Sequence, residues 1–314
     1  MPRTDMNPMY VSPYMTVLCD KTGRLRGVQD HTGNRDTVWL EDSMLERYSG
    51  TPRYVDFRTA ANGGKGSASN DGLSPDTPLL TMAAALTAVQ DYDSIGFVGK
   101  CTESGLSSSK TGVRIYGMGR NSGAQCIWHP SSSATAITVN GKGWQFDNFK
   151  AEPAAGKTLI SASQTASVNG SDLVIAFVEQ NGGGMLLDAA NIDNVTLINI
   201  FGHDADTAVI RCNDITVSPA LRWRIIGGWF LNNLNHVIAK LTDSVVVGGF
   251  YQAQGYSQTA TSKLDLSGAS AGRNIVTGII ATGTYSIAGG YKAGTGDTWF
   301  DINTSSGKTS SVPA

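Results

Sequence analysis

Short apolar runs of strand length recur along most of this chain, and polar segments rich in Gly and Asn separate them. The runs are Val113–Tyr116, Trp144–Phe149, Leu173–Val178, Val195–Phe201, Trp223–Phe230, Val245–Tyr251 and Asn274–Ile280. With Phe149, Phe177, Ile200, Trp229, Phe250 and Ile279 taken as equivalent anchors, the intervals are 28, 23, 29, 21 and 29 residues. Internal repetition at intervals of about 20 to 50 residues is typical of solenoids. The pattern predicts stacked β-rungs that keep their strands and vary their loops.

Composition supports β-rungs over helices. Only 16% of the 314 residues are Asp, Glu, Lys or Arg, and 37 residues are Gly. An average globular domain has about 25% charged residues, and surface helices are rich in Glu and Lys. The chain uses uncharged Ser, Thr, Asn and Gly instead. We therefore expect an all-β fold, a right-handed parallel β-helix.

One helix is expected before the first apolar run. Thr77 is a candidate N-cap and Pro78 suits the first helical position. Apolar residues then follow at helical spacing, at Leu79, Met82, Ala83, Leu86 and Val89. They form one narrow stripe. A helix with such a stripe is expected to cover the open edge and apolar interior of the first rung.

The same segment carries a resemblance. Residues 71–89, DGLSPDTPLLTMAAALTAV, resemble the entrance of pectate-lyase-like right-handed β-helix proteins, bacteriophage tailspikes in particular. The resemblance implies a virion-attachment region followed by a homotrimeric β-helix that meets host surface polysaccharide. It gives four expected parts: an N-terminal arm at 1–55, an entry strand, loop and capping helix at 56–90, the β-helix at 91–296, and a polar C-terminal tail at 297–314.

Residues 1–55 differ from the rest of the chain. They contain charge runs, several Met and Tyr, and no steady alternation of apolar and polar positions. Such a segment has too little apolar periodicity to close a core alone. It is either an arm that packs on other virion proteins of the tail, baseplate or head, or a small irregular subdomain.

Stacked rungs place equivalent side chains about 4.8 Å apart, so each offset from the anchors gives a column on the surface. Offset three gives Glu152, Gln180, His203, Asn232, Ala253 and Thr282, and offset four gives Pro153, Asn181, Asp204, Asn233, Gln254 and Gly283. A glycan groove on this face is one interpretation. Its candidate acid and base are Glu179, His203, Asp204 and Asp206, and its candidate glycan contacts are Glu152, Asn181, Asn232, Asn233, Gln252, Gln254 and Tyr256. The alternative is structural, because polar residues follow buried strands wherever loops are solvated.

Exposed aromatic rings stack on sugars, and five aromatic residues are candidates for that role: Trp144, Trp223, Trp229, Tyr251 and Tyr256. Trp229 occupies an anchor position, which favours the core for its ring. The paired-Asp and Gly-His-Gly signatures of polygalacturonase-type β-helix hydrolases are absent, as is the Arg and Ca²⁺-binding Asp cluster of pectate lyases.

Two functions follow as hypotheses. One is a noncatalytic virion protein of tailspike or tail-fibre type that recognises a host glycan. The other is a glycan depolymerase on the same β-helix. Its groove lies either on these columns or between subunits, where carboxylates of two chains, such as Glu179 with Asp204 or Asp243, complete a pair. A surface adhesin of the same fold ranks behind both, because no export signal is visible.

The remaining expectations concern partners and location. The net charge of −2 gives no attraction to nucleic acid. No apolar run approaches the roughly 20 residues that span a bilayer. We expect synthesis in the host cytoplasm, incorporation in the virion and no membrane insertion. Because His129 and His236 lie far from carboxylate clusters and no CxxC pair occurs, we expect neither a metal site nor a cofactor.

Overall fold

The chain divides into two compact units, Met1–Ser49 and Gly50–Ala314. The computed structural model describes residues 7–12, 15–19, 25–30, 37–39, 50–118, 126–130, 135–165, 169–213, 220–252, 259–268 and 271–313. In the first unit, β1 (Asn7–Ser12), β2 (Met15–Cys19), β3 (Leu25–Asp30) and β4 (Thr37–Trp39) form an antiparallel sheet in the order of the chain. The described part of this unit is therefore a β-meander.

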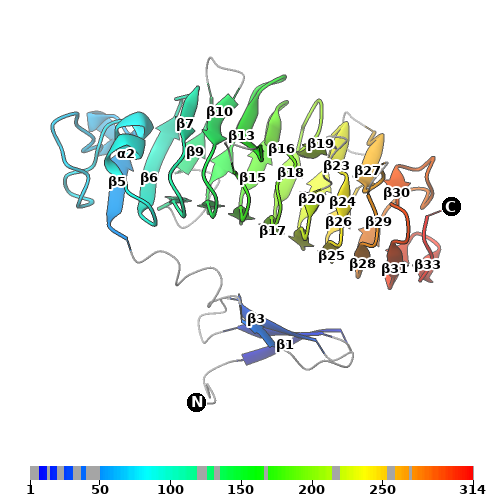
Figure 1. Cartoon of the computed structure of the whole chain (residues 1–314). Helices are drawn as coiled ribbons and strands as arrows, with labels where there is room; N and C mark the ends of the chain where they lie inside the picture. Colours follow the sequence, from blue (N-terminus) through cyan, green and yellow to red (C-terminus); the bar gives the residue numbers. More distant parts are fainter. Residues whose placement is uncertain are drawn as a thin grey trace. The chain divides into compact units, whose positions relative to one another are not determined.

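The second unit is a right-handed parallel β-helix, as expected, and its strands stack side by side along the unit (Figure 1). A complete rung crosses three faces, and its crossovers have the hand usual for parallel strands. The first face contains β5 (Pro52–Asp56), β6 (Ser94–Cys101), β8 (Arg114–Gly117), β11 (Gln145–Asp147), β14 (Val174–Ala176), β17 (Thr196–Ile198), β21 (Arg224–Ile226), β25 (Val245–Val247), β28 (Ile275–Thr277) and β31 (Thr298–Phe300).

The second face continues the first around a corner, and β6 takes part in both. It contains β9 (Cys126–Trp128), β12 (Lys150–Ala151), β15 (Glu179–Asn181), β18 (Phe201–His203), β22 (Trp229–Leu231), β26 (Phe250–Tyr251), β29 (Ile280–Ala281), β32 (Ile302–Thr304) and β33 (Gly307–Thr309). The third face is an eight-stranded sheet of β7 (Leu106–Ser108), β10 (Thr135–Val139), β13 (Thr158–Ser163), β16 (Met185–Ala190), β19 (Ile210–Asn213), β23 (Asn235–Ala239), β27 (Ser262–Asp265) and β30 (Tyr291–Lys292). A short pair, β20 (Ala220–Leu221) and β24 (Leu241–Thr242), lies outside these sheets.

Left-handed residues build the corner between the first and second faces. Seven of them have φ between 47° and 67° and are Asn148, Phe177, Asn199, Gly227, Gly248, Gly278 and Asp301. In two rungs a second left-handed glycine follows, Gly228 with φ of 109° and Gly249 with φ of 102°. Gly, Asn and Asp enter this region at the lowest cost, whereas a bulky residue is strained there. The corner turns the chain sharply, so the rungs can stay in register even though their loops vary in length.

A helix covers the N-terminal end of the β-helix as expected, but it begins later than predicted. Helix α2 (Met82–Ala88) packs against β5 and β6, and Met82, Ala85 and Leu86 are its buried residues (Figure 1). Ala83 was expected to face the core, but the structure places it outward, and Ala85 faces the core instead. A short 3-10 helix, η1 (Ala60–Asn62), lies in the preceding loop.

The predicted N-cap is wrong because Thr77 has another partner. Its hydroxyl donates to Asp71 Oδ1 at 2.9 Å, while Thr81 caps α2 by accepting from the backbone N–H of Ala84 at 3.1 Å. Glu103 accepts from the two free N–H groups of Met82 and Ala83. A carboxylate at that end also complements the helix dipole.

The ends of the predicted parts also need correction. The expected boundary at residue 55 falls inside β5, which pairs with β6. The polar tail expected at 297–314 continues the β-helix instead: β31 pairs with β28, and Trp299 is 1% exposed. Two inward apolar side chains, Trp299 and Ile302, among Gly, Ser and Thr residues gave too weak an apolar signal to be recognised as strands.

No helix among the described residues is long and apolar enough to cross a membrane.

Candidate functional site

The structure corrects the register of the predicted anchors on the second face. The carbonyl groups that form one hydrogen-bond ladder after the corner belong to Phe149, Val178, Ile200, Gly228, Gly249 and Ile279. Three predicted anchors, Phe177, Trp229 and Phe250, are therefore one residue out of register. Because side chains alternate along a strand, a shift of one residue moves a side chain to the other surface.

Two columns of side chains point outward from the second face. The first column is Ile127, Lys150, Glu179, Phe201, Trp229, Phe250 and Ile280. The second is His129, Glu152, Asn181, His203, Leu231, Gln252 and Thr282. The interior receives Trp128, Ala151, Gln180, Gly202, Phe230, Tyr251 and Ala281 instead. The predicted column of polar residues thus mixes outward and inward positions.

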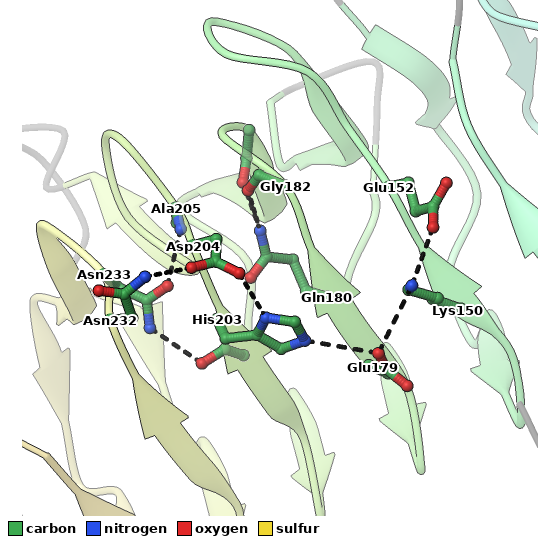
Figure 2. Close-up of polar contacts among 12 residues, drawn as sticks. Lys150, Glu152, Glu179, Gln180, Gly182, His203, Asp204, Ala205, Asn232 and Asn233 are labelled. Carbon is green, nitrogen blue, oxygen red and sulfur yellow. Dashed lines mark hydrogen bonds and ion pairs between the residues drawn. The ribbon is translucent and has the colours of Figure 1, made fainter. Parts of the chain in front are cut away.

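A network of charged and polar side chains occupies the middle of these columns (Figure 2). His203 contacts two carboxylates, through Nδ1 to Asp204 Oδ2 at 2.7 Å and through Nε2 to Glu179 Oε1 at 3.4 Å. The side-chain amide of Asn232 donates to the other oxygen of Asp204. Lys150 lies 3.8 Å from Glu179. Three of the four predicted acid–base candidates therefore meet in one place.

Burial and hydrogen bonding act in opposite directions on Asp204. Burial raises the pKa of its carboxyl group, but hydrogen bonds from His203 and Asn232 outweigh burial and hold that pKa below its ordinary value. Glu152 shows the same balance. Burial raises the pKa of its carboxyl group, but Lys150, Lys100 and His129 lower it by more, so the pKa lies below its ordinary value. Both groups carry negative charge at neutral pH.

Two buried amides support the network from below. Asn233 accepts from the backbone N–H of Ala205 at 2.8 Å and donates to the carbonyl of Gly202 at 2.9 Å. Gln180 donates to the carbonyls of Gly182 and Gly184 at 2.7 and 2.8 Å. Neither amide reaches solvent, so Asn233, a predicted glycan contact, holds the turn that carries His203 and Asp204.

Aromatic rings continue the surface beyond the network. Phe201 lies 4.7 Å from the imidazole of His203 and 5.5 Å from Trp229, measured between ring centroids, and Trp229 meets Phe250 at 5.9 Å. Trp229 is 51% exposed. The expectation of a core position for Trp229 is wrong, because the diglycine Gly227–Gly228 fills the corner and puts the ring on the outer surface.

The other candidates are distributed unevenly. Asn181 and Gln252 lie half-buried in the second outward column, Asn232 is buried against Asp204, and Asp206 is exposed on the turn after Asp204. Gln254 and Tyr256 lie outside the described residues. The rings of Trp144, Trp223 and Tyr251 are buried and unavailable for stacking.

Sequence reasoning missed Phe201 and Lys150, and it placed Trp229 in the core. The signal that finds all three is the corner itself. Counting from the first left-handed residue of each corner, the residue two positions later points outward, as at Phe201 after Asn199 and Trp229 after Gly227.

Among the described residues, no three His, Cys, Asp or Glu side chains are arranged to hold a metal ion. His129 lies 3.5 Å from Glu152 at the N-terminal end of the network. His236 is fully buried, with Nε2 2.7 Å from the carbonyl oxygen of Gln252 and Nδ1 3.1 Å from the amide of Asn233. His236 therefore belongs to the interior.

No protein-family model and no curated protein sequence matches the chain. A crystal structure of a pectin methylesterase in complex with a hexasaccharide is similar to it, with a TM-score of 0.40 and 10% sequence identity over 83% of this chain and 91% of that chain. A similarity of this size establishes neither a family nor a substrate.

Proposed function

We propose that the protein is a noncatalytic carbohydrate-recognition β-helix, and that the outer surface of β12, β15, β18, β22 and β26 binds the glycan. The observation that carries this proposal is the exposed ring of Trp229 beside Phe201 and His203. A pyranose ring has apolar C–H faces and hydroxyl-bearing edges. This surface offers an aromatic platform for the faces and carboxylate and amide oxygens for the hydroxyl groups.

Exposure of such a platform needs an explanation. Large apolar side chains that are exposed side by side often mark an interaction site. Trp229 is exposed on a rung whose interior is already filled by the rings of Trp223 and Phe230. The ring of Trp229 is therefore not required to complete the core, which supports a binding role.

The geometry favours binding over hydrolysis. Glycoside hydrolysis requires the scissile bond between two carboxyl groups, one of which donates a proton. The imidazole of His203 fills the space between Glu179 and Asp204 and contacts both. Asp204 also has a lowered pKa and holds no proton to donate at neutral pH.

The entrance motif of residues 71–89 and the separate N-terminal unit support a setting for this function. In a phage particle of tailspike type, the N-terminal unit attaches to the virion and the β-helix meets the host surface polysaccharide. A homotrimer would present three such surfaces and raise the avidity for a repetitive glycan.

Substitution of Trp229 by alanine tests the proposal. We expect Trp229→Ala to weaken binding to a polysaccharide by about tenfold or more, as for an exposed aromatic anchor. Phe300→Ala, which removes an exposed aromatic from the first face, is the matched control and should bind normally. The measurement is biolayer interferometry of the full chain against capsular and O-antigen polysaccharides.

Reducing-end release from the same samples distinguishes recognition from depolymerisation. Binding without release supports recognition. Release that is lost in Glu179→Gln and Asp204→Asn would establish the depolymerase instead. Equal binding by wild type and Trp229→Ala would remove this surface as the site.

A further inference from the structure

We propose that the glycan site selects uncharged sugars and discriminates against acidic ones such as uronates and sialylated chains. This inference rests on the proposed function and adds the class of ligand to it. It follows from how the charges of the second face are already paired within the chain (Figure 2).

The cation at the centre of the site is not free to receive an anion. Lys150 Nζ lies 2.9 Å from Glu152 and 3.8 Å from Glu179, and its side chain is only 14% exposed. An acidic sugar that paired with Lys150 would have to displace one of these carboxylates. The displaced group would stay half-buried without its partner, which is costly.

Two basic side chains at the N-terminal end of the network also face a carboxylate of the chain. Lys100 lies 3.8 Å from Glu152 with its side chain 51% exposed, and His129 lies 3.5 Å from the same carboxylate oxygen. Arg supplies the two-pronged donors that suit a sugar carboxylate, and none stands in the sequences of β9, β12, β15, β18, β22 or β26. Arg224 is exposed, but it lies on β21 of the first face.

Negative charge exceeds positive charge where the sugar would lie. The three carboxylates of Glu152, Glu179 and Asp204 stand against two lysine amines, Lys100 and Lys150. An incoming carboxylate therefore meets like charge beside Trp229, and like charges at a contact oppose binding.

Uncharged sugars meet a complementary surface. Their hydroxyl groups donate to carboxylate oxygens, which accept several hydrogen bonds each. The carboxylates of Glu179 and Asp204 keep acceptor capacity beyond their contacts with His203. Hydrogen bonds from neutral donors to charged acceptors are stronger than neutral pairs. The carboxylate oxygens of Glu179 and Asp204 thus attract sugar hydroxyl groups and repel sugar carboxylates.

The test compares polysaccharides that differ only in charge. Each acidic bacterial polysaccharide of a panel is used in its native form and after chemical reduction of its carboxyl groups to primary alcohols, which keeps the linkages. Affinities for the full chain are measured by biolayer interferometry at low ionic strength. We expect the reduced form to bind about tenfold more tightly, the order expected of one like-charge contact near the surface. Added salt should narrow the gap by screening.

A charge-matched pair of variants locates the effect. The double variant Glu179→Gln with Asp204→Asn removes two negative charges from the site, and we expect it to reduce the preference for the uncharged form. The control is Asp76→Asn with Asp243→Asn, which removes the same charge from exposed positions elsewhere and should keep the preference. Circular dichroism confirms that each variant is folded.

The outcomes separate the two proposals. Acidic forms that bind as tightly as their reduced partners, with or without added Ca²⁺, would overturn the selectivity and leave carbohydrate recognition standing. An unchanged preference in the Glu179→Gln and Asp204→Asn variant would also overturn it. Failure of every form to bind would overturn both proposals.

Discussion

The rungs before β16 and the rungs from β22 onward share one backbone pattern, but they differ on the outer surface. The earlier rungs carry ion pairs outside: Arg114 with Asp147 on the first face and Lys150 with Glu152 on the second. The later rungs carry apolar side chains at equivalent positions, among them Trp229, Phe250, Ile275 and Ile280. These columns therefore change from charged to apolar along the β-helix, while ion pairs such as Arg273 with Asp243 lie at other positions of the later rungs.

The interior changes in the opposite direction. At the start of the third face the inward column reads Ala136, Leu159, Leu186 and Val209, and then His236 and Lys263. Both of these last side chains are buried, and burial lowers the pKa of each. Lys263 donates to the carbonyl of Gly289 and lies 5.4 Å from the ring of Tyr291.

The comparison teaches that a rung repeats its hydrogen bonds and its corner, not its side chains. Parallel stacking satisfies the backbone equally in every rung. Each column is then free to change its chemistry, provided that buried polar groups find partners. Function can therefore be confined to a few rungs of a uniform scaffold.

The largest effect is expected from two adjacent residues on β22 that face opposite surfaces. Phe230 is fully buried, whereas its neighbour Trp229 is half-exposed. We expect Phe230→Ala to lower the free energy of unfolding by about 3–5 kcal/mol, because it leaves a cavity. Trp229→Ala should lower it by less than about 1 kcal/mol, because the removed ring is largely at the surface. Denaturant titration measures both changes. Equal losses of stability would contradict an inward Phe230 and an outward Trp229.

A smaller effect is expected from the polar interior, as a dependence of stability on pH. Burial lowers the pKa of His236 from 6.5 to about 4 in the folded chain. As the pH falls below 6.5, the unfolded chain binds the proton first, so folding loses stability until the pH reaches the folded-state pKa. We expect a loss of about 3 kcal/mol between pH 6.5 and pH 4, and none above this range.

The matched variants are His236→Gln and His129→Gln, studied by urea unfolding at pH 7.0, 5.5 and 4.5. His236→Gln should flatten the pH dependence in this window, whereas His129→Gln should preserve it. A wild-type stability that stays constant from pH 6.5 to pH 4.5 would contradict a neutral, buried His236.

The smallest effect concerns the corner, where Phe177 is the exception to a column of Asn, Gly and Asp. Phe177 has φ of 54° and is 49% exposed. A left-handed conformation costs a bulky residue roughly 1–2 kcal/mol. We expect Phe177→Asn to raise the free energy of unfolding by about 1 kcal/mol, because Asn tolerates this conformation. Asn199→Phe, the reverse change one rung later, should lower it, and thermal unfolding of both tests the rule.

The repetition and the composition predicted the β-helix, because strand-length apolar runs reflect the backbone period that all rungs share. They did not predict which surface each aromatic residue faces. Phe177, Trp229 and Phe250 are large and apolar, and hydrophobicity alone assigned them to the core. The structure puts Val178, Gly228 and Gly249 at the inward position of the corner, one residue away from each of these large side chains.

The candidate site was predicted in part for a related reason. His203, Asp204 and Glu179 are close in sequence or one rung apart, so the repeat brought them together. Lys150 was missed because its role depends on the register between β12 and β15. Asn233 was assigned to the surface because an asparagine after a strand is typical of a solvated loop. Its burial follows from the hydrogen bonds that the neighbouring turn demands.

The first outward column has a consequence for any polymer that lies along it. Successive rungs are about 4.8 Å apart, and each rung presents a different side chain: Lys150, Glu179, Phe201 and Trp229 follow one another. A polymer that shifted by one rung would exchange an aromatic contact for a charged one. A column of identical side chains would let a polymer bind in many registers, whereas this column would favour one register and one direction of the polymer.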